Sequence, residues 1–235
     1  MFSIIIPTLN EQEIIKRTIK QFDSIKDKYL VEIIVSDSNS IDKTVDIANN
    51  YADKVILYNN DSGCNIATAR NNGAKNAIYN TLIFLDADIL INDVEEFFKK
   101  INTQLFNSKL VAFSPRITIN PCEENNIDKA VHFLISLISN IMNNFGFGYS
   151  RGGCQIIKSK YFNLVDGYNE SYIAGEDVDL FRRLRKFGKT LILNSILVYE
   201  SPRRYRKYGY IYVLFNWFMN WFYTLIFKKS FSTKW

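Results

Sequence analysis

Two acidic motifs are the positions at which this chain could carry out chemistry, and the first is Asp86-Ala87-Asp88. It directly follows the apolar run Thr81–Leu85, which is typical of a buried strand. Because alternate residues at a strand end point to the same side, Asp86 and Asp88 can face one ligand together. Carboxylate oxygens suit Mg²⁺ or Mn²⁺, and such an ion neutralises the charge that develops on a departing diphosphate. The spacing therefore predicts a metal and nucleotide site.

The second motif, Glu176-Asp177, stands at the start of a predicted helix over 176–187. A reaction in which a hydroxyl attacks a carbon atom needs a base that takes the hydroxyl proton. A carboxylate at a helix start can do this, so Asp177 and its neighbour Glu176 are the candidate catalytic residues. Acidic residues also stabilise helix N-termini without any catalytic role. The residues alone leave both interpretations of Asp177 open.

The elements that must position these residues alternate between strands and helices in the first half of the chain. Short apolar runs predict strands, and apolar residues three or four apart predict helices. The predicted strands are 3–6, 32–36, 54–58 and 81–85, and the predicted helices are 11–26, 40–51 (with Ser40 as N-cap), 66–79 and 94–106. This order predicts an α/β fold with a mainly parallel, Rossmann-like sheet flanked by helices. Ligands of such sheets bind at the carboxyl ends of the strands, where Pro7-Thr8, Asp37-Ser38 and Asp86 fall.

The second half of the chain is less regular. We expect strands at 110–119, 152–157 and 190–198 and helices at 127–145 and 176–187. The helix over 127–145 is unusually apolar, which suits either the core or a membrane surface. His132, the only histidine, lies in it and is expected to have a core or interface role.

The last apolar segment, 210–227, has no charged residue and is rich in Trp, Phe and Tyr. Its polar residues recur every four positions and would form one stripe on a helix: Tyr212, Asn216, Asn220, Thr224 and Lys228. This pattern, with basic residues at both ends, favours a helix that lies in a membrane interface. A short membrane span, or packing on the rest of the chain or on a dimer partner, remain as alternatives.

Composition and charge set the expected organisation. A length of 235 residues with 47% hydrophobic residues suits a single α/β domain over 1–208, followed by a membrane-associating helix and basic tail over 209–235. Seven of the 29 basic residues and none of the 24 acidic residues follow Glu200, which predicts anionic partners there. We expect binding to the cytoplasmic face of a membrane through 209–228, a possible homodimer and no nucleic-acid partner. Three widely spaced cysteines without a CxxC pair indicate reduced thiols.

Several ordered motifs give the chain a resemblance to the family 2 glycosyltransferases, which have the GT-A fold. The resemblance covers about residues 2–200 and rests on the segments 4–11 (IIIPTLNE), 36–44 (SDSNSIDKT), 69–73 (ARNNG), 85–88 (LDAD), 166–170 (DGYNE) and 175–180 (GEDVDL). It implies a transfer with inversion from a UDP- or GDP-sugar, with Mn²⁺ or Mg²⁺ as cofactor.

The resemblance also implies roles for individual residues. The nucleotide side of the site would be formed by Pro7, Thr8, Glu11, Asp37, Arg70, Asp86, Ala87 and Asp88. Asp88 would be the direct metal ligand and Asp177 the general base, and Gly153 and Cys154 would lie near the sugar and acceptor. Arg203 and Arg204 resemble a terminal basic motif that clamps the diphosphate, although they could equally meet lipid phosphates.

One departure from the family bears on the acceptor. Members of the dolichyl-phosphate mannose synthase type attack with an ionised phosphate, need no base, and carry a glutamine where this chain has Leu90. We therefore expect a hydroxyl acceptor on a lipid-linked saccharide or glycolipid. The alternatives are a polyprenyl- or dolichyl-phosphate sugar synthase and a catalytically silent sugar-nucleotide-binding membrane protein. A sugar-1-phosphate nucleotidyltransferase is disfavoured because Pro7–Glu11 contains no glycine.

Overall fold

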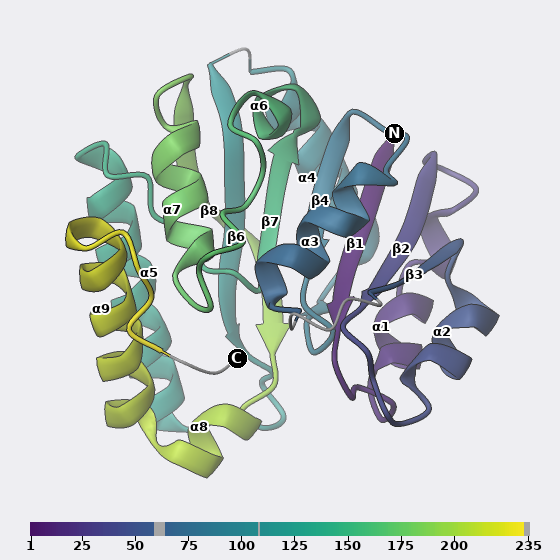
Figure 1. Cartoon of the computed structure of the whole chain (residues 1–235), viewed down its shortest axis with the longest axis horizontal. Coiled ribbons are helices and arrows are strands. Elements are labelled where there is room, and N and C mark those ends of the chain that lie inside the picture. Colours follow the sequence, from purple (N-terminus) through teal and green to yellow (C-terminus); the bar gives the residue numbers. More distant parts are fainter. Residues whose placement is uncertain (59–63, 108, 233–235) are drawn as a thin grey trace.

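An eight-stranded sheet runs through the centre of the computed structural model, which describes residues 1–58, 64–107 and 109–232 (Figure 1). The strand order across the sheet is β3-β2-β1-β4-β7-β6-β8-β5. The strands are β1 (Phe2–Thr8), β2 (Val31–Asp37), β3 (Lys54–Leu57), β4 (Thr81–Leu85), β5 (Leu90–Ile91), β6 (Leu110–Ile119), β7 (Cys154–Lys158) and β8 (Lys189–Glu200).

The first half of the sheet is parallel, as the alternation of strands and helices predicts. β1 pairs in parallel with β2 and β4, and β2 with β3. Every residue of β1 is buried, which explains its continuous apolar sequence. Thr8 and Asp37 are register partners at the carboxyl ends of β1 and β2, and Asp86 directly follows β4. The predicted polar edge of the sheet is therefore confirmed.

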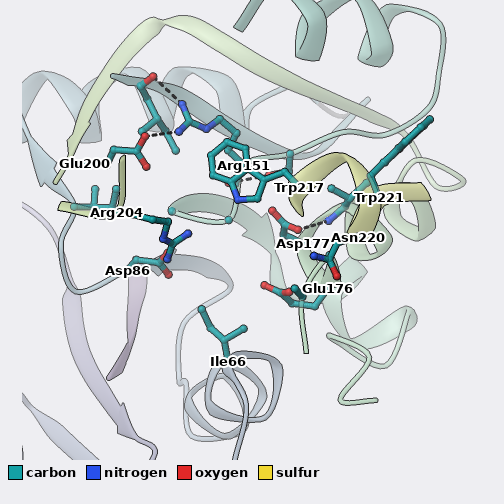
Figure 2. Close-up of a pocket in the computed structure, with 18 of the residues that line it drawn as sticks. Ile66, Asp86, Arg151, Glu176, Asp177, Glu200, Arg204, Trp217, Asn220 and Trp221 are labelled. Atoms are coloured by element: carbon teal, nitrogen blue, oxygen red, sulfur yellow. Dashed lines mark hydrogen bonds and ion pairs between the residues drawn. The ribbon is translucent and has the colours of Figure 1, made fainter. Parts of the chain in front are cut away.

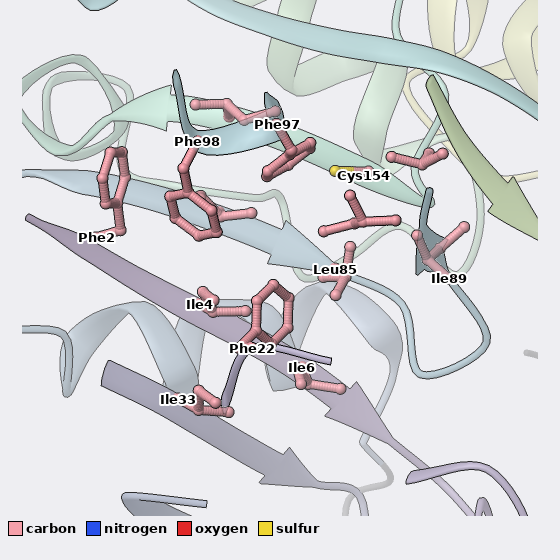
Figure 3. Close-up of a cluster of buried hydrophobic side chains, with 14 of the residues drawn as sticks. Phe2, Ile4, Ile6, Phe22, Ile33, Leu85, Ile89, Phe97, Phe98 and Cys154 are labelled. Atoms are coloured by element: carbon pink, nitrogen blue, oxygen red, sulfur yellow. The ribbon is translucent and has the colours of Figure 1, made fainter. Parts of the chain in front are cut away.

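Helices cover both faces of the sheet. α1 (Ile15–Lys20) and α4 (Val94–Leu105) contribute to the hydrophobic cluster on one face, with α2 (Thr44–Tyr51) beside α1. α3 (Ile66–Lys75), α6 (Ser159–Leu164) and α7 (Glu176–Leu184) contribute to the cluster on the other face. The larger cluster includes the labelled phenylalanines of Figure 3, among which Phe2 and Phe98 meet edge to face with ring centroids 4.9 Å apart.

Two predictions about the first helices are wrong. The helix expected over 11–26 is limited to α1 and a short 3₁₀ turn, because the Glu11 and Gln12 amides donate to Thr44 Oγ1 and Asp42 Oδ2 at 2.8 and 3.2 Å. Ser40 is not the N-cap of α2, which begins at Thr44. Its hydroxyl donates instead to Asp37 Oδ2 at 2.6 Å and holds the turn after β2.

The second half of the sheet is mixed rather than parallel. β7 runs antiparallel to β4 and β6, β6 pairs in parallel with β8, and β5 is antiparallel to β8. The direction of β7 matters for function, because it pairs Cys154 with Leu85 and puts Gly153 beside Asp86. The Asp86 amide donates to the Gly153 carbonyl at 2.9 Å. The loop before β7 is therefore fixed next to the first acidic motif.

The C-terminal half adds three further helices: α5 (Asn126–Asn144), α8 (Arg203–Tyr208) and α9 (Tyr210–Ile226). α5 and α9 run along the same end of the molecule, at the left of Figure 1. α5 is not a core helix, because only one of its faces is buried. None of the helices in the described ranges has both the length and the hydropathy needed to cross a membrane.

Candidate active site

A pocket opens at the carboxyl end of β4, between the loop that precedes β7, the start of α7 and one face of α9 (Figure 2). Seven of the residues given a site role from the sequence line it: Arg70, Asp86, Asp88, Gly153, Glu176, Asp177 and Arg204. In Figure 2, Asp86 lies on one side of the pocket and Glu176 and Asp177 lie on the other. The fold thus brings the two acidic motifs, about ninety residues apart in the chain, into one cavity.

Arg70 connects the two acidic motifs. Its guanidinium donates to Asp86 Oδ1 at 2.7 Å and to Glu176 Oε1 at 2.8 Å, and the side chain is only 1% exposed. A third bond reaches the Gly152 carbonyl at 3.1 Å. Arginine suits this position because its planar fork can serve two carboxylates at once. The guanidinium is committed to these two acids, and its predicted contact with the diphosphate stays a prediction.

The close approach of α3 to the sheet is what carries Arg70 to this depth. A Cβ atom on Gly73 would lie 2.3 Å from Ile5 Cγ2 on β1, so a larger residue would push the helix outwards. The small size of Gly73 therefore helps to set the position of Arg70 in the pocket.

Asp177 faces the pocket and does not act as the cap of its helix. The N-cap of α7 is Gly175, which has φ +84° and makes no side-chain capping bond. A Cβ atom on Gly152 would lie 3.3 Å from Asp177 Oδ2 and 3.2 Å from Arg70 Nη2. Gly152 thus lets the chain pass between the half-buried Asp177 carboxylate and the buried Arg70 guanidinium. Asp177 Oδ1 also accepts from the Val178 amide at 2.8 Å in the first turn of α7, so stabilisation of the helix N-terminus stands beside the catalytic interpretation.

Burial and like charges raise the pKa values of the acids around the pocket. Burial first, and then the neighbouring Asp177, raise the pKa of Glu176 to about 7, while Arg70 opposes the shift. Burial also raises the pKa of Asp177, again against the charge of Arg70. The pKa of Asp88 rises to about 7 through burial and the charge of Asp86, with Arg203 opposing. Five carboxylates and three arginines line the pocket, which leaves it with an excess of negative charge.

Asp86 and Asp88 could hold a divalent metal ion together with a substrate. The described ranges contain no cluster of three or more His, Cys, Asp or Glu residues with metal-site geometry. Mg²⁺ in nucleotide sites usually takes one or two carboxylates and completes its shell with phosphates and water, so two aspartates suffice. Both side chains are partly exposed, and the charge of Asp86 that raises the pKa of Asp88 is what a shared cation would offset.

The predicted nucleotide residues on β1 and β2 form a separate, buried cluster at the same edge of the sheet. The Thr8 hydroxyl donates to Asp37 Oδ2 at 2.9 Å, and the Ser40 amide donates to Asp37 Oδ1 at 2.7 Å. Pro7 is also buried, and none of these residues lines the pocket. Ala87 packs into the core, and its carbonyl accepts a hydrogen bond from Thr18, which anchors the first acidic motif.

The two arginines of the terminal basic motif point to different places. Arg204 lines the pocket. Arg203 instead donates to both Glu11 oxygens at 3.0 and 2.6 Å, and its Nη2 lies 3.6 Å from Asp88 Oδ2. Glu11 is therefore linked to the first acidic motif through the C-terminal part of the chain.

Cys154 does not lie at the site, although the resemblance places it near the sugar. Its side chain is buried in the core cluster, as Figure 3 shows, and only its neighbours Gly152 and Gly153 line the pocket. Cys64, Cys122 and Cys154 are all free thiols, as the spacing predicts.

Several pocket residues were not singled out from the sequence. Arg151 is buried, forms an ion pair with Glu200, and lies 5.5 Å from the centre of the Trp217 ring. Asn220 and Trp221 of α9 complete this wall. Their spacing with Trp217 (i, i+3, i+4) puts all three on one helix face, and that pattern could have revealed them.

Comparisons with known proteins agree with this geometry. The model of the family described as "Glycosyl transferase family 2" matches residues 3–154. A curated validoxylamine A glucosyltransferase from Streptomyces hygroscopicus subsp. jinggangensis is 34% identical over 97 residues, which are 38% of this chain and 22% of that protein. The match thus spans less than a quarter of this relative's length.

Solved structures share the fold at low sequence identity. The mannosyltransferase PcManGT from Pyrobaculum calidifontis, in complex with GDP-Man and Mn²⁺, superposes with a TM-score of 0.66 at 17% identity, covering 85% of this chain and 56% of that one. S. aureus TarS 1–349 in complex with UDP-GlcNAc gives 0.64 at 18% identity, with coverages of 85% and 58%. Glucosyl-3-phosphoglycerate synthase from Mycobacterium tuberculosis, with Mn²⁺ and UDP, gives 0.63 at 16% identity, with coverages of 97% and 79%.

Proposed function

The chain belongs to glycosyl transferase family 2 and has the GT-A fold, and from this premise we propose that it transfers a sugar from a nucleotide-diphosphate sugar to a hydroxyl acceptor. The observation that carries the proposal is the Arg70 bridge. It ties Asp86, on the predicted donor side, to Glu176, the neighbour of the predicted base. Donor and acceptor chemistry would then meet in the same pocket.

Asp177 is the residue that would take the acceptor proton. In the proposed step, the acceptor oxygen bonds to the anomeric carbon as its proton passes to the Asp177 carboxylate. The bond from that carbon to the diphosphate breaks, and its electron pair leaves with the diphosphate oxygen. Attack opposite to the leaving group inverts the anomeric centre. Burial makes Asp177 a stronger base than an exposed aspartate, because it raises the pKa.

The donor side would be formed by the first acidic motif and the basic motif. Asp86 and Asp88 would hold Mn²⁺ or Mg²⁺, which as a Lewis acid neutralises the charge of the departing diphosphate. Arg204 in the pocket wall and Arg203 beside Asp88 would bind the diphosphate oxygens. Structures with the same fold contain GDP-Man with Mn²⁺ or UDP with Mn²⁺, which supports a UDP- or GDP-sugar as donor.

The proposed acceptor is a hydroxyl of a lipid-linked saccharide or another glycan. A phosphate acceptor is already ionised and needs no base, so it would leave Asp177 in the pocket without a role. The wall of Trp217 and Trp221 offers an amphipathic aromatic surface beside Asp177.

Nucleoside diphosphate release from a panel of UDP- and GDP-sugars, with Mn²⁺ and with or without membrane lipid extract, tests the proposal. The Asp177→Asn variant should lose about 10²–10⁴-fold in kcat, the usual contribution of a general base, while the Kd for nucleoside diphosphate stays unchanged. Asp27→Asn, at an exposed position, is the matched control. Full turnover by Asp177→Asn would remove Asp177 as the base.

A further inference from the structure

Exposed apolar side chains gather on the outer faces of α5 and α9, and we call this surface the α5–α9 face. Its members are Ile127, Phe133, Leu134, Leu137, Ile138 and Ile141 on α5, and Ile211, Phe215, Phe218, Phe222 and Ile226 on α9. Soluble monomers rarely expose contiguous apolar patches of more than a few hundred Å², and larger patches mark binding surfaces. We propose that the α5–α9 face docks the protein on an anionic lipid bilayer.

The polarity of α9 is the reverse of that of an ordinary surface helix. Two members of the predicted polar stripe point inwards, Asn220 and Thr224, which are 4% and 2% exposed, whereas Phe218 is 56% exposed. The Asn220 amide is fully used inside the protein: its oxygen accepts from the amides of Phe231 and Ser232 at 3.0 Å, and its nitrogen donates to Ser232 Oγ at 2.7 Å. A helix in water normally exposes its polar side. The outward apolar side of α9 therefore suits a medium other than water.

α5 shows the same reversal independently. Its buried face carries His132, Ser136, Ser139 and Asn143, while Leu137 on the outer face is 46% exposed. The serine hydroxyls donate to carbonyls of their own helix, and Asn143 exchanges hydrogen bonds with the backbone of Tyr149. The two serines and Asn143 are thus satisfied by the protein, so nothing requires the helix to turn them towards solvent.

A buried anchor joins the first turns of the two helices. Asp128 of α5 accepts from Arg206 Nη1 at 2.8 Å and from the Tyr210 hydroxyl at 2.5 Å. The His132 and Tyr210 rings meet edge to face, with centroids 6.2 Å apart. Figure 1 shows the helices rising from this point along the same end of the molecule. The anchor therefore holds the two helices together at their first turns, at the same end of the molecule.

The charges around the face select an anionic bilayer over a second copy of the chain. Segments 125–147 and 201–235 contain a single acid, Asp128, which is buried and paired. Lys207 and Lys228 are exposed at the two ends of α9, and Lys129 on α5 is exposed but lies 4.0 Å from Glu124. Two copies packed face to face would bring Lys207 and Lys228 together, and neither segment supplies a further carboxylate to pair them. Anionic headgroups would pair them, and the aromatic side chains suit the interfacial region.

This docking would also bring the pocket to the lipid surface. The inner side of α9 supplies Trp217 and Trp221 to the pocket wall, and a helix with its side chains is only about 10 Å across. A lipid-linked acceptor could then reach Asp177 without leaving the bilayer. This last step rests on the proposed function, whereas the docking itself does not.

Co-sedimentation of the full chain with phosphatidylcholine vesicles, with and without phosphatidylglycerol, tests the proposal. We expect binding that is stronger to the anionic vesicles and falls at least about tenfold in both Leu137→Glu and Phe218→Glu, because each puts a charge on the face. Phe106→Glu is the matched control, since Phe106 is 88% exposed at the end of α4 and lies outside the face. It should bind as the unchanged protein does.

Three results would overturn the proposal: full binding by both face variants, equal binding to neutral vesicles, or a stable dimer that binds no vesicles. Circular dichroism and binding of nucleoside diphosphate show whether each variant is folded. Failure of the proposed function has a different signature, because vesicle binding would persist while no donor gives nucleoside diphosphate release.

Discussion

Arg70 sits at the centre of an unusual charge balance. One buried guanidinium faces Asp86 and Glu176, with Asp177 and Asp88 close by in the same pocket. A buried ion pair of this kind adds little net stability, because desolvation offsets its attraction, but it fixes the positions of its members. The excess negative charge is accommodated by retained protons and, in our proposal, by a metal ion with the donor.

The pH dependence of the reaction should report this charge balance. A base must be ionised to act, and the pKa of Asp177 is raised while that of its neighbour Glu176 is about 7. We therefore expect kcat/KM to rise with pH up to near neutrality and then to level off. The apparent pKa belongs to the pair and not to either residue alone. Steady-state kinetics between about pH 5 and pH 9 measures this acid limb.

The Glu176→Gln variant separates the pair. It removes the competing carboxylate and leaves Arg70 to act on Asp177, so the acid limb should move to lower pH. Glu95→Gln, an exposed control, should leave the limb in place. An unmoved limb in Glu176→Gln would show that the two acids do not titrate together. The free energy of unfolding of the unchanged protein should fall as pH rises, whereas its activity rises. The folded chain holds the Glu176 proton more tightly than the unfolded chain, so the stability from this proton is lost as pH rises from about 4.5 to about 7.

At the scale of elements, what the sequence could predict depended on local pattern. Buried parallel strands show as continuous apolar runs, so the polar edge formed by Thr8, Asp37 and Asp86 was predictable. The antiparallel direction of β7 was not, because strand pairing depends on the path of the chain between elements. Gly152 could therefore not be assigned a place beside Asp177 from its own segment.

The orientation of α9 was predictable only in part. The four-residue spacing put Asn220 and Thr224 on one side of the helix, but which side meets the protein depends on the polar partners available there. Asn220 finds them in Phe231 and Ser232, and Trp217 packs against Arg151. Asn220 and Thr224 therefore turn inwards while Tyr212 and Lys228 stay exposed, which no hydrophobic pattern alone would indicate.

The anchor between α5 and α9 gives a stability prediction. Arg206 donates to Asp128 and, with burial opposing, holds the pKa of that carboxyl well below its usual range. Asp128 also completes the capping box of α5 with Asn125. Asp128→Asn should therefore lower the free energy of unfolding by about 1.5–3 kcal/mol at pH 7, the usual contribution of hydrogen bonds to a charged group. Urea denaturation measures the difference.

The same anchor predicts how that difference depends on pH. Because the folded-state pKa of Asp128 is depressed, its contribution is present above the unfolded-state pKa of about 3.9 and is lost as pH falls further. The difference in free energy of unfolding between Asp128→Asn and the unchanged protein should therefore become smaller in acid. Asp46→Asn, in the exposed first turn of α2, should show no such difference. If Asp128→Asn and the unchanged protein have equal urea midpoints at pH 7, the Asp128 contacts do not stabilise the fold.

At the scale of the whole molecule, the C-terminal segment closes over the edge of the sheet that the N-terminal half forms. Arg203 reaches Glu11, 192 positions earlier in the chain, and also approaches Asp88. The donor side of the pocket is therefore shared between residues just after β1, residues just after β4 and the start of α8. The family model ends at residue 154, so this closing segment lies beyond the matched part of the chain.

This arrangement predicts that Arg203→Ala changes the KM for the donor much more than it changes the Tm. Arg203 is 53% exposed, and exposed ion pairs contribute about 0–1 kcal/mol, so Arg203→Ala should leave the Tm almost unchanged. A diphosphate would instead compete with Glu11 for the guanidinium, and loss of a charge-assisted hydrogen bond of about 1.5–3 kcal/mol should raise the donor KM about 10- to 100-fold. Donor titration of nucleoside diphosphate release measures this shift. Arg17→Ala, an exposed arginine on α1, should change neither quantity. A lowered Tm with an unchanged donor KM would show that Arg203 stabilises the fold and does not bind the diphosphate, which would then be bound by Arg204 alone.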